Sequence, residues 1–157
     1  MNIDLSYLVN TMKHLIETPS PVGYYDAIKP VIESYAAELG YAVTYDNRDT
    51  AYITVEGRDT SKTVCVSAHA DTLGFMVRGI NSDGTLRLRA VGGINFANVE
   101  GENVTVHTRG GKTYTGMLVC AHHSAHAFDD AKRKHAQQTF GVHSAIILFH
   151  PNRTPIG

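Results

Sequence analysis

The spacing of the hydrophobic residues changes at Gly40, and this change constrains the fold more than any other feature of the sequence. Before Gly40, apolar residues recur every three or four positions over 5–16 and again over 25–39, which predicts two amphipathic helices. After Gly40, apolar and polar residues alternate over 41–45 and 51–55, as they do in half-exposed strands. Two helices followed by strands predict an α/β fold in which helices cover a sheet.

Individual residues mark the ends of the two predicted helices. Asp4 is a suitable N-cap for the first helix, and the Thr-Pro-Ser-Pro sequence at 18–21 ends it. Pro30 fits poorly inside a helix that begins at Tyr25, so it predicts either a kink or a later start. Gly40 suits the left-handed position that follows a helix.

A nearly continuous apolar run at 63–67 predicts a central strand that is covered on both faces. Cys65 lies in this run, and Cys120 lies in a second apolar stretch. We therefore expect both thiols to be buried and reduced, as in a cytoplasmic protein, although the sequence leaves a disulfide open as the alternative.

Short strands separated by turns are predicted from Gly74 onward. The turns at 81–84 (Asn-Ser-Asp-Gly) and 109–112 (Arg-Gly-Gly-Lys) predict two hairpins, with strands at 75–80 and 85–91 and at 103–108 and 113–119. Such strands favour a small barrel or sandwich. The apolar run at 145–149 is either one more strand or part of a non-native tail.

The composition excludes some partners. A formal net charge of -1 gives no basic surface for nucleic acid or an anionic membrane. No apolar run approaches the roughly 20 residues that cross a bilayer, and the first residues show no secretory signal. We expect a cytoplasmic protein with neither nucleic-acid nor membrane partners.

The tripeptide His69-Ala70-Asp71 carries the strongest indication of chemistry. Residues i and i+2 of a strand point to one face, so His69 and Asp71 are predicted to lie together. Imidazole binds zinc or cobalt well, and a carboxylate that accepts the other ring N–H fixes the tautomer of the ligand. By itself the tripeptide is more common as a buried, hydrogen-bonded histidine followed by an aspartate that caps a turn.

The surroundings of the tripeptide resemble a known family. The segment 18–24 precedes a helix, and an apolar run then leads into Ala-His-Ala-Asp-Thr-Leu-Gly-Phe-Met-Val at 68–77. Further matching pieces lie at 81–86, 91–93, 101–104, 110–112 and 126–132. This order resembles the tetrahedral aminopeptidases of metallopeptidase family forty-two, whose members are often labelled glutamyl aminopeptidase or endoglucanase.

The resemblance implies a zinc-peptidase-like α/β/α sheet, incomplete in this chain, that is interrupted by a β-rich, barrel-like dimerisation domain. Residues 1–73 would be the N-terminal part of the catalytic domain, 74–134 part of the inserted domain, and 135–157 an atypical tail. It also implies two divalent metal ions (zinc or cobalt) and a peptide substrate. His69 would be a metal ligand and Asp71 the catalytic carboxylate that orients it. Family members associate into dimers and then a tetrahedral dodecamer.

The chain departs from the family after Lys134. Family members are considerably longer, and their other metal ligands and their glutamate base follow the inserted domain. We expect a truncated or frame-shifted reading of a longer gene, because the ending from His135 to Gly157 is atypical of the family. A catalytic zinc needs about three protein ligands, so we expect this chain alone to be inactive. The alternative function is that of an inactive fragment that self-associates. The neighbouring His122, His123 and His126 are interpreted as part of an exposed loop.

Overall fold

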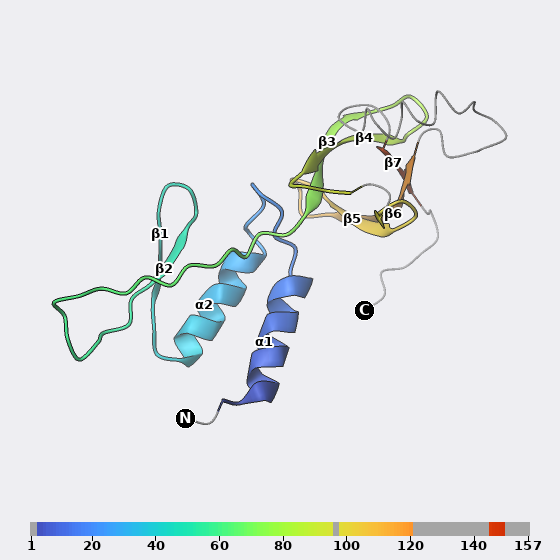
Figure 1. The fold of residues 1–157 in the computed structure, drawn as a ribbon. Helices are drawn as coiled ribbons and strands as arrows, with labels where there is room; N and C mark the ends of the chain where they lie inside the picture. Colours follow the sequence, from blue (N-terminus) through green and yellow to red (C-terminus); the bar gives the residue numbers. More distant parts are fainter. Residues whose placement is uncertain (1–2, 96–97, 121–144, 150–157) are drawn as a thin grey trace. The chain divides into compact units, whose positions relative to one another are not determined.

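The computed structural model describes residues 3–95, 98–120 and 145–149 (Figure 1). The chain divides into two compact units, Met1–Leu73 and Gly74–Gly157. One sheet has two strands and the other has five, and all the strand pairs are antiparallel. The predicted α/β fold is thus confirmed in the form of helices with small antiparallel sheets. In the described part of the chain, neither helix is long and apolar enough to cross a membrane.

Helix α1 spans Leu5–Glu17, as the sequence predicts. The backbone N–H of Tyr7 donates to the Asp4 carboxylate over 3.0 Å, so Asp4 is the N-cap. At the other end, the Thr18 N–H donates to the His14 carbonyl, and Pro19 follows at once. Proline cannot continue the backbone hydrogen bonding, and the helix ends there.

Helix α2 spans Ile28–Glu38 and begins later than Tyr25. The later start places Pro30 in the first turn, where a helix makes no use of the missing N–H. At the C-terminal end, the N–H of Gly40 donates to Ala37 and that of Tyr41 to Ala36. This is the Schellman pattern, and Gly40 has the left-handed φ of +81° that it requires.

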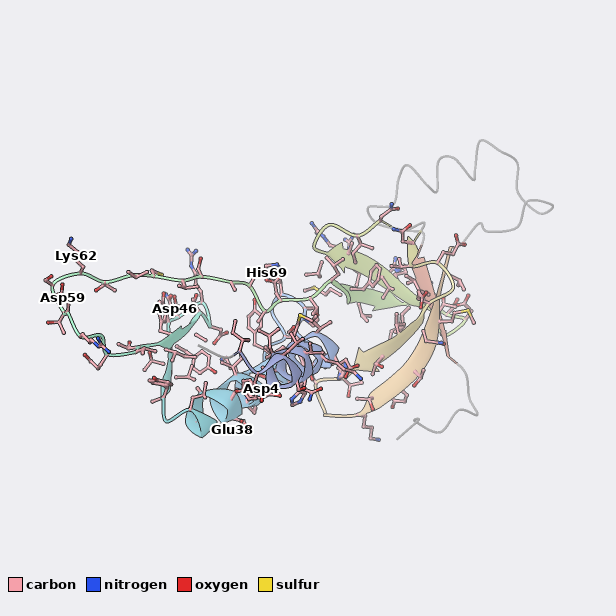
Figure 2. The ribbon with its side chains drawn as sticks, turned by 60° about the horizontal axis from the view of Figure 1, so that its bottom comes forward. Asp4, Glu38, Asp46, Asp59, Lys62 and His69 are labelled. Carbon is pink, nitrogen blue, oxygen red and sulfur yellow. The ribbon has the colours of Figure 1, made fainter. Side chains whose placement is uncertain are left out.

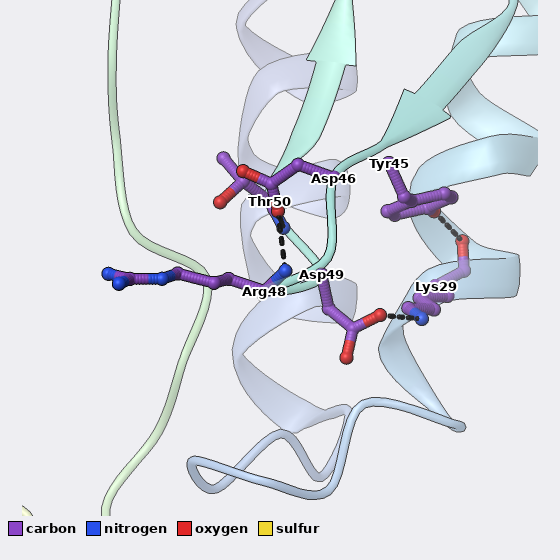
Figure 3. Close-up of polar contacts among 6 residues, drawn as sticks. All are labelled: Lys29, Tyr45, Asp46, Arg48, Asp49 and Thr50. Atoms are coloured by element: carbon purple, nitrogen blue, oxygen red, sulfur yellow. Dashed lines mark hydrogen bonds and ion pairs between the residues drawn. The ribbon is translucent and has the colours of Figure 1, made fainter.

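Strands β1 (Val43–Tyr45) and β2 (Ala51–Ile53) form an antiparallel hairpin. Its loop is organised by Asp46 (Figure 3). The Asp46 carboxylate accepts the N–H groups of Arg48 and Thr50 over 2.8 and 2.9 Å and the Tyr52 hydroxyl over 3.2 Å. These hydrogen bonds, above all the one from the Thr50 backbone, lower the pKa of Asp46. The lowered pKa of Asp46 therefore reflects its role in holding the turn together.

Lys29 joins α2 to this hairpin. Its ammonium group pairs with Asp49 and lies 4.9 Å from the centre of the Tyr45 ring (Figure 3). Burial, followed by the hydrogen bond and charge of Glu33, raises the pKa of Tyr45 to about 12.

The central strand predicted at 63–67 is wrong. These residues belong to no strand, and the side chains of Val64 and Val66 are 86% and 91% exposed. A strand covered on both faces needs hydrogen-bonded neighbours, and within the described residues β1 and β2 pair only with each other. Cys65 is free, but it is exposed rather than buried as predicted. The side chain of Cys120 lies outside the described residues.

The second unit contains a five-stranded sheet of order β3-β4-β7-β6-β5. Its strands are β3 (Gly74–Ile80), β4 (Leu86–Val91), β5 (Asn103–His107), β6 (Thr113–Cys120) and β7 (Ala145–Phe149). Both predicted hairpins are confirmed, and the candidate strand at 145–149 is β7. Among the described strands, β3 and β5 are edges, so barrel-like closure stays a prediction.

Three leucines form the buried core of this sheet among the side chains that the structure describes. They are Leu86, Leu88 and Leu118. Arg87 and Arg89 alternate with the two β4 leucines and are exposed, as expected of strand residues that point to opposite faces. The partly buried residues packed against the leucines are Phe75, Val99, Val104 and Val106.

Candidate metal-ligating site

His69 and Asp71 lie on the long segment between β2 and β3, within the first unit. Figure 2 labels His69 on this segment. This segment is not a strand at His69, so the predicted strand end is wrong. The predicted pairing nevertheless occurs, because His69 Nδ1 lies 3.3 Å from Asp71 Oδ1. The same nitrogen also lies 3.3 Å from the Asp71 carbonyl oxygen.

These contacts determine which nitrogen of His69 is available to a ligand. An ionised carboxylate and a carbonyl oxygen are both acceptors, so Nδ1 carries the proton and donates. In the neutral ring, Nε2 then holds the free lone pair. The His69 side chain is 84% exposed, which contradicts the alternative of a buried structural histidine. The contacts with Asp71 therefore favour the ring tautomer that carries its proton on Nδ1, and they leave Nε2 accessible.

The residues that follow α1 hold this segment in place. The Thr72 N–H donates to the Ser20 carbonyl over 3.1 Å, and Pro21 and Thr72 form a parallel bridge. From the sequence, Ser20 is predicted only to belong to the helix end and to the family pattern. The segment that Ser20 contacts is some fifty positions away in sequence, so the residues around Ser20 do not predict this contact. The only local signal is the position of Ser20 between two prolines.

The pair by itself does not provide enough ligands for a catalytic metal ion. Catalytic zinc is held by about three protein ligands, and the described residues contain no group of three or more His, Cys, Asp or Glu that could hold a metal ion. His14 is engaged elsewhere, with its Nδ1 3.0 Å from the Tyr35 hydroxyl. His107 ends β5. The other six histidines lie outside the described residues: His122, His123, His126, His135, His143 and His150.

Comparison with known proteins decides the family. The model of the M42 glutamyl aminopeptidase family matches residues 50–147, which is more than half of the chain. The chain belongs to this family.

Two curated relatives bear aminopeptidase names. A Bacillus subtilis protein named "Putative aminopeptidase YhfE" is 35% identical over 127 residues, which are 81% of this chain and 37% of the relative. The "Glutamyl aminopeptidase" of Lactococcus lactis is 32% identical over 106 residues, which are 67% of this chain and 30% of that protein. The M42 chain therefore spans about a third of the length of these two relatives.

A solved structure shows the same fold. The TET1 peptidase of Pyrococcus horikoshii, described as assembling into a tetrahedron or a large octahedral shell, matches with a TM-score of 0.66. The identity is 20%, and the match covers 90% of this chain and 46% of that one.

Proposed function

We propose that this M42 chain is part of a metal-dependent aminopeptidase that removes N-terminal residues from peptides. The observation that carries the proposal is the His69–Asp71 pair, in which the carboxylate engages Nδ1 and leaves Nε2 accessible. Family membership and the aminopeptidase names of the relatives support it. In this proposal Met1–Leu73 belongs to the catalytic domain, and residues 74–134 belong to an inserted dimerisation domain.

His69 is the proposed ligand of one of two divalent metal ions, zinc or cobalt, and Asp71 orients it. The chemistry of the pair fits this role, because histidine ligands commonly donate their second N–H to a carboxylate. Two bound metal ions would polarise the substrate carbonyl and provide hydroxide near neutral pH. Since the described residues supply one ligand, the remaining ligands must come from residues outside them.

Hydrolysis of aminoacyl-anilides with added zinc or cobalt tests the proposal. The wild-type chain is compared with His69→Ala and with His14→Ala, a control that removes an exposed histidine bonded to a tyrosine. We expect His69→Ala to abolish metal binding, together with any activity that the wild-type chain shows, and His14→Ala to leave both unchanged. Asp71→Asn should weaken metal binding about 10- to 100-fold, as is typical for the partner of a ligand. A wild-type chain that binds metal no better than His69→Ala would contradict the proposed role of His69, whereas metal binding without activity would favour the inactive fragment.

A second candidate function is self-association through the five-stranded sheet. Strand β3 is an edge of the sheet in the described part of the chain, and it exposes Met76, Val77 and Ile80 by 57%, 42% and 72%. An edge strand with exposed apolar side chains is a template for pairing with another chain. The shells described for the Pyrococcus horikoshii peptidase agree with this candidate.

Size-exclusion chromatography with light scattering tests self-association. A lysine on an edge strand opposes pairing, so Ile80→Lys should shift the wild-type oligomer toward monomer. Val64→Lys is the matched control, because it adds the same charge to an exposed apolar position outside the sheet. A monomeric wild-type chain, or an equal effect of both lysines, would rule out association through β3.

A further inference from the structure

We infer that Ser20 is a positioning residue for the His69–Asp71 pair and acts through Ala70 and Thr72. The inference rests on the proposed function, in which His69 binds a metal ion. It assigns a role to a residue that contacts neither the metal ligand nor the carboxylate directly.

The Ser20 side chain is buried and hydrogen bonded. Its exposure is 0%, although it lies between two prolines in a connecting segment. The hydroxyl donates to the Ala70 carbonyl over 2.7 Å, and its oxygen lies 3.4 Å from Thr72 Oγ1. Buried hydroxyl groups are normally paired, and removal of this one would leave the Ala70 carbonyl without its donor.

The backbone of Ser20 makes two further bonds to the same segment. Its N–H donates to Thr72 Oγ1 over 3.3 Å, and its carbonyl accepts the Thr72 N–H over 3.1 Å. Ala70 and Thr72, the two neighbours of Asp71, are therefore both bonded to Ser20. Both peptide groups of Asp71 are fixed from one side.

This attachment determines which side of the segment carries the pair. In extended backbone, successive side chains point in opposite directions. Thr72 faces Ser20, so Asp71 faces away, with its side chain 45% exposed, and His69 two positions earlier lies on the same side. Residues 63–69 belong to no strand, so no described sheet holds His69 in place. Ser20 supplies the anchor that a strand would otherwise provide.

Cobalt binding to the full 157-residue chain tests this role. Affinity and the visible absorption of bound Co²⁺ are measured for wild type, Ser20→Ala, Thr72→Val and Thr72→Ser. The first two variants remove the hydroxyl contact, whereas Thr72→Ser retains it. We expect Ser20→Ala and Thr72→Val to weaken binding about tenfold, the lower end for groups that orient a ligand. They should also alter the absorption spectrum, and Thr72→Ser should restore wild-type behaviour.

Thr18→Val is the matched control for a purely structural effect. Thr18 Oγ1 donates to the His14 carbonyl over 2.7 Å, the same kind and length of bond as Ser20 makes, but its acceptor lies in α1 rather than at residues 69–72. We expect this variant to bind cobalt as wild type does. Wild-type cobalt binding by Ser20→Ala and Thr72→Val, or equal weakening by Thr18→Val, would overturn the inference. If Ser20→Ala does not fold, Thr72→Val decides.

A second readout separates the inference from the proposed function. The amide nitrogen of Asp71 is bonded to the Ala70 carbonyl carbon, so its NMR chemical shift responds to the hydrogen bond from Ser20. We expect this shift to move in Ser20→Ala and to stay unchanged in Thr18→Val. If wild type binds cobalt no better than His69→Ala, the proposed role of His69 fails, while an unchanged Asp71 shift in Ser20→Ala would refute the positioning role by itself.

Discussion

Replacement of Gly40 by alanine measures the free-energy cost of placing an L-residue in the left-handed backbone conformation. Gly40 has a φ of +81°, and a Cβ atom added there meets nothing within 4 Å. The substitution therefore creates no clash, and its whole effect comes from the left-handed conformation. That conformation costs an L-residue about 1–2 kcal/mol, and the smaller entropy of the unfolded alanine chain offsets part of it. We expect the free energy of unfolding to fall by about 1 kcal/mol.

Two further variants make the Gly40 test specific. Gly40→Asn should cost less than Gly40→Ala, because asparagine adopts the left-handed region more readily. At Gly57, a Cβ would lie 3.6 Å from the Asp59 carbonyl oxygen, an ordinary contact, and φ is not left-handed. Gly57→Ala should thus change stability by less than about 0.5 kcal/mol. Urea unfolding followed by far-ultraviolet circular dichroism measures all three. Equal losses for Gly40→Ala and Gly40→Asn, or for Gly40→Ala and Gly57→Ala, would refute the reasoning.

Three other predictions concern the core, the titration and the thiol. Leu118 is 2% exposed, so Leu118→Ala should destabilise the second unit by about 2–5 kcal/mol in urea unfolding, and a loss under 1 kcal/mol would show that the site collapses. Because the pKa of Tyr45 is raised to about 12, folding favours its neutral form. The resulting contribution to the free energy of unfolding is complete below about pH 10 and is lost as the pH rises to about 12. Tyrosinate absorbance of wild type minus Tyr45→Phe should show that ionisation, and a difference at the ordinary value would contradict it. Exposed Cys65 should react with a thiol reagent in the native state, and peptide mapping that finds it unmodified would contradict its exposure.

Local signals in the sequence predicted much of the secondary structure. The ends of α1 follow from Asp4 and Pro19, because each makes or prevents hydrogen bonds within its own turn. The later start of α2 follows from Pro30 in the same way. The prediction of a strand at 63–67 was wrong. An apolar run indicates only that a segment can be buried, whereas a strand also needs a neighbouring strand to pair with, and that neighbour is not encoded in the segment.

At the candidate site, too, local contacts were predicted from the sequence and long-range contacts were not. The sequence predicted the His69–Asp71 pair because the two residues are two positions apart and their contact is local. It did not predict that Ser20 holds them, since that contact joins positions fifty apart and depends on how the chain returns past the end of α1. Membership of the M42 family was predictable because the motif at 68–77 is itself local.

The place of β7 in the sheet has a consequence for the order of folding. The β3–β4 and β5–β6 hairpins consist of neighbouring residues and can form early, but β7 is the last of the described strands in sequence and lies between them. During synthesis, both β4 and β6 therefore present unpaired edges until residues 145–149 have emerged. Isolated two-stranded hairpins are marginally stable in water, and unpaired edges associate with other chains. Pairing of β7 with β4 and β6 thus removes two edges at which the nascent chain could associate with other chains.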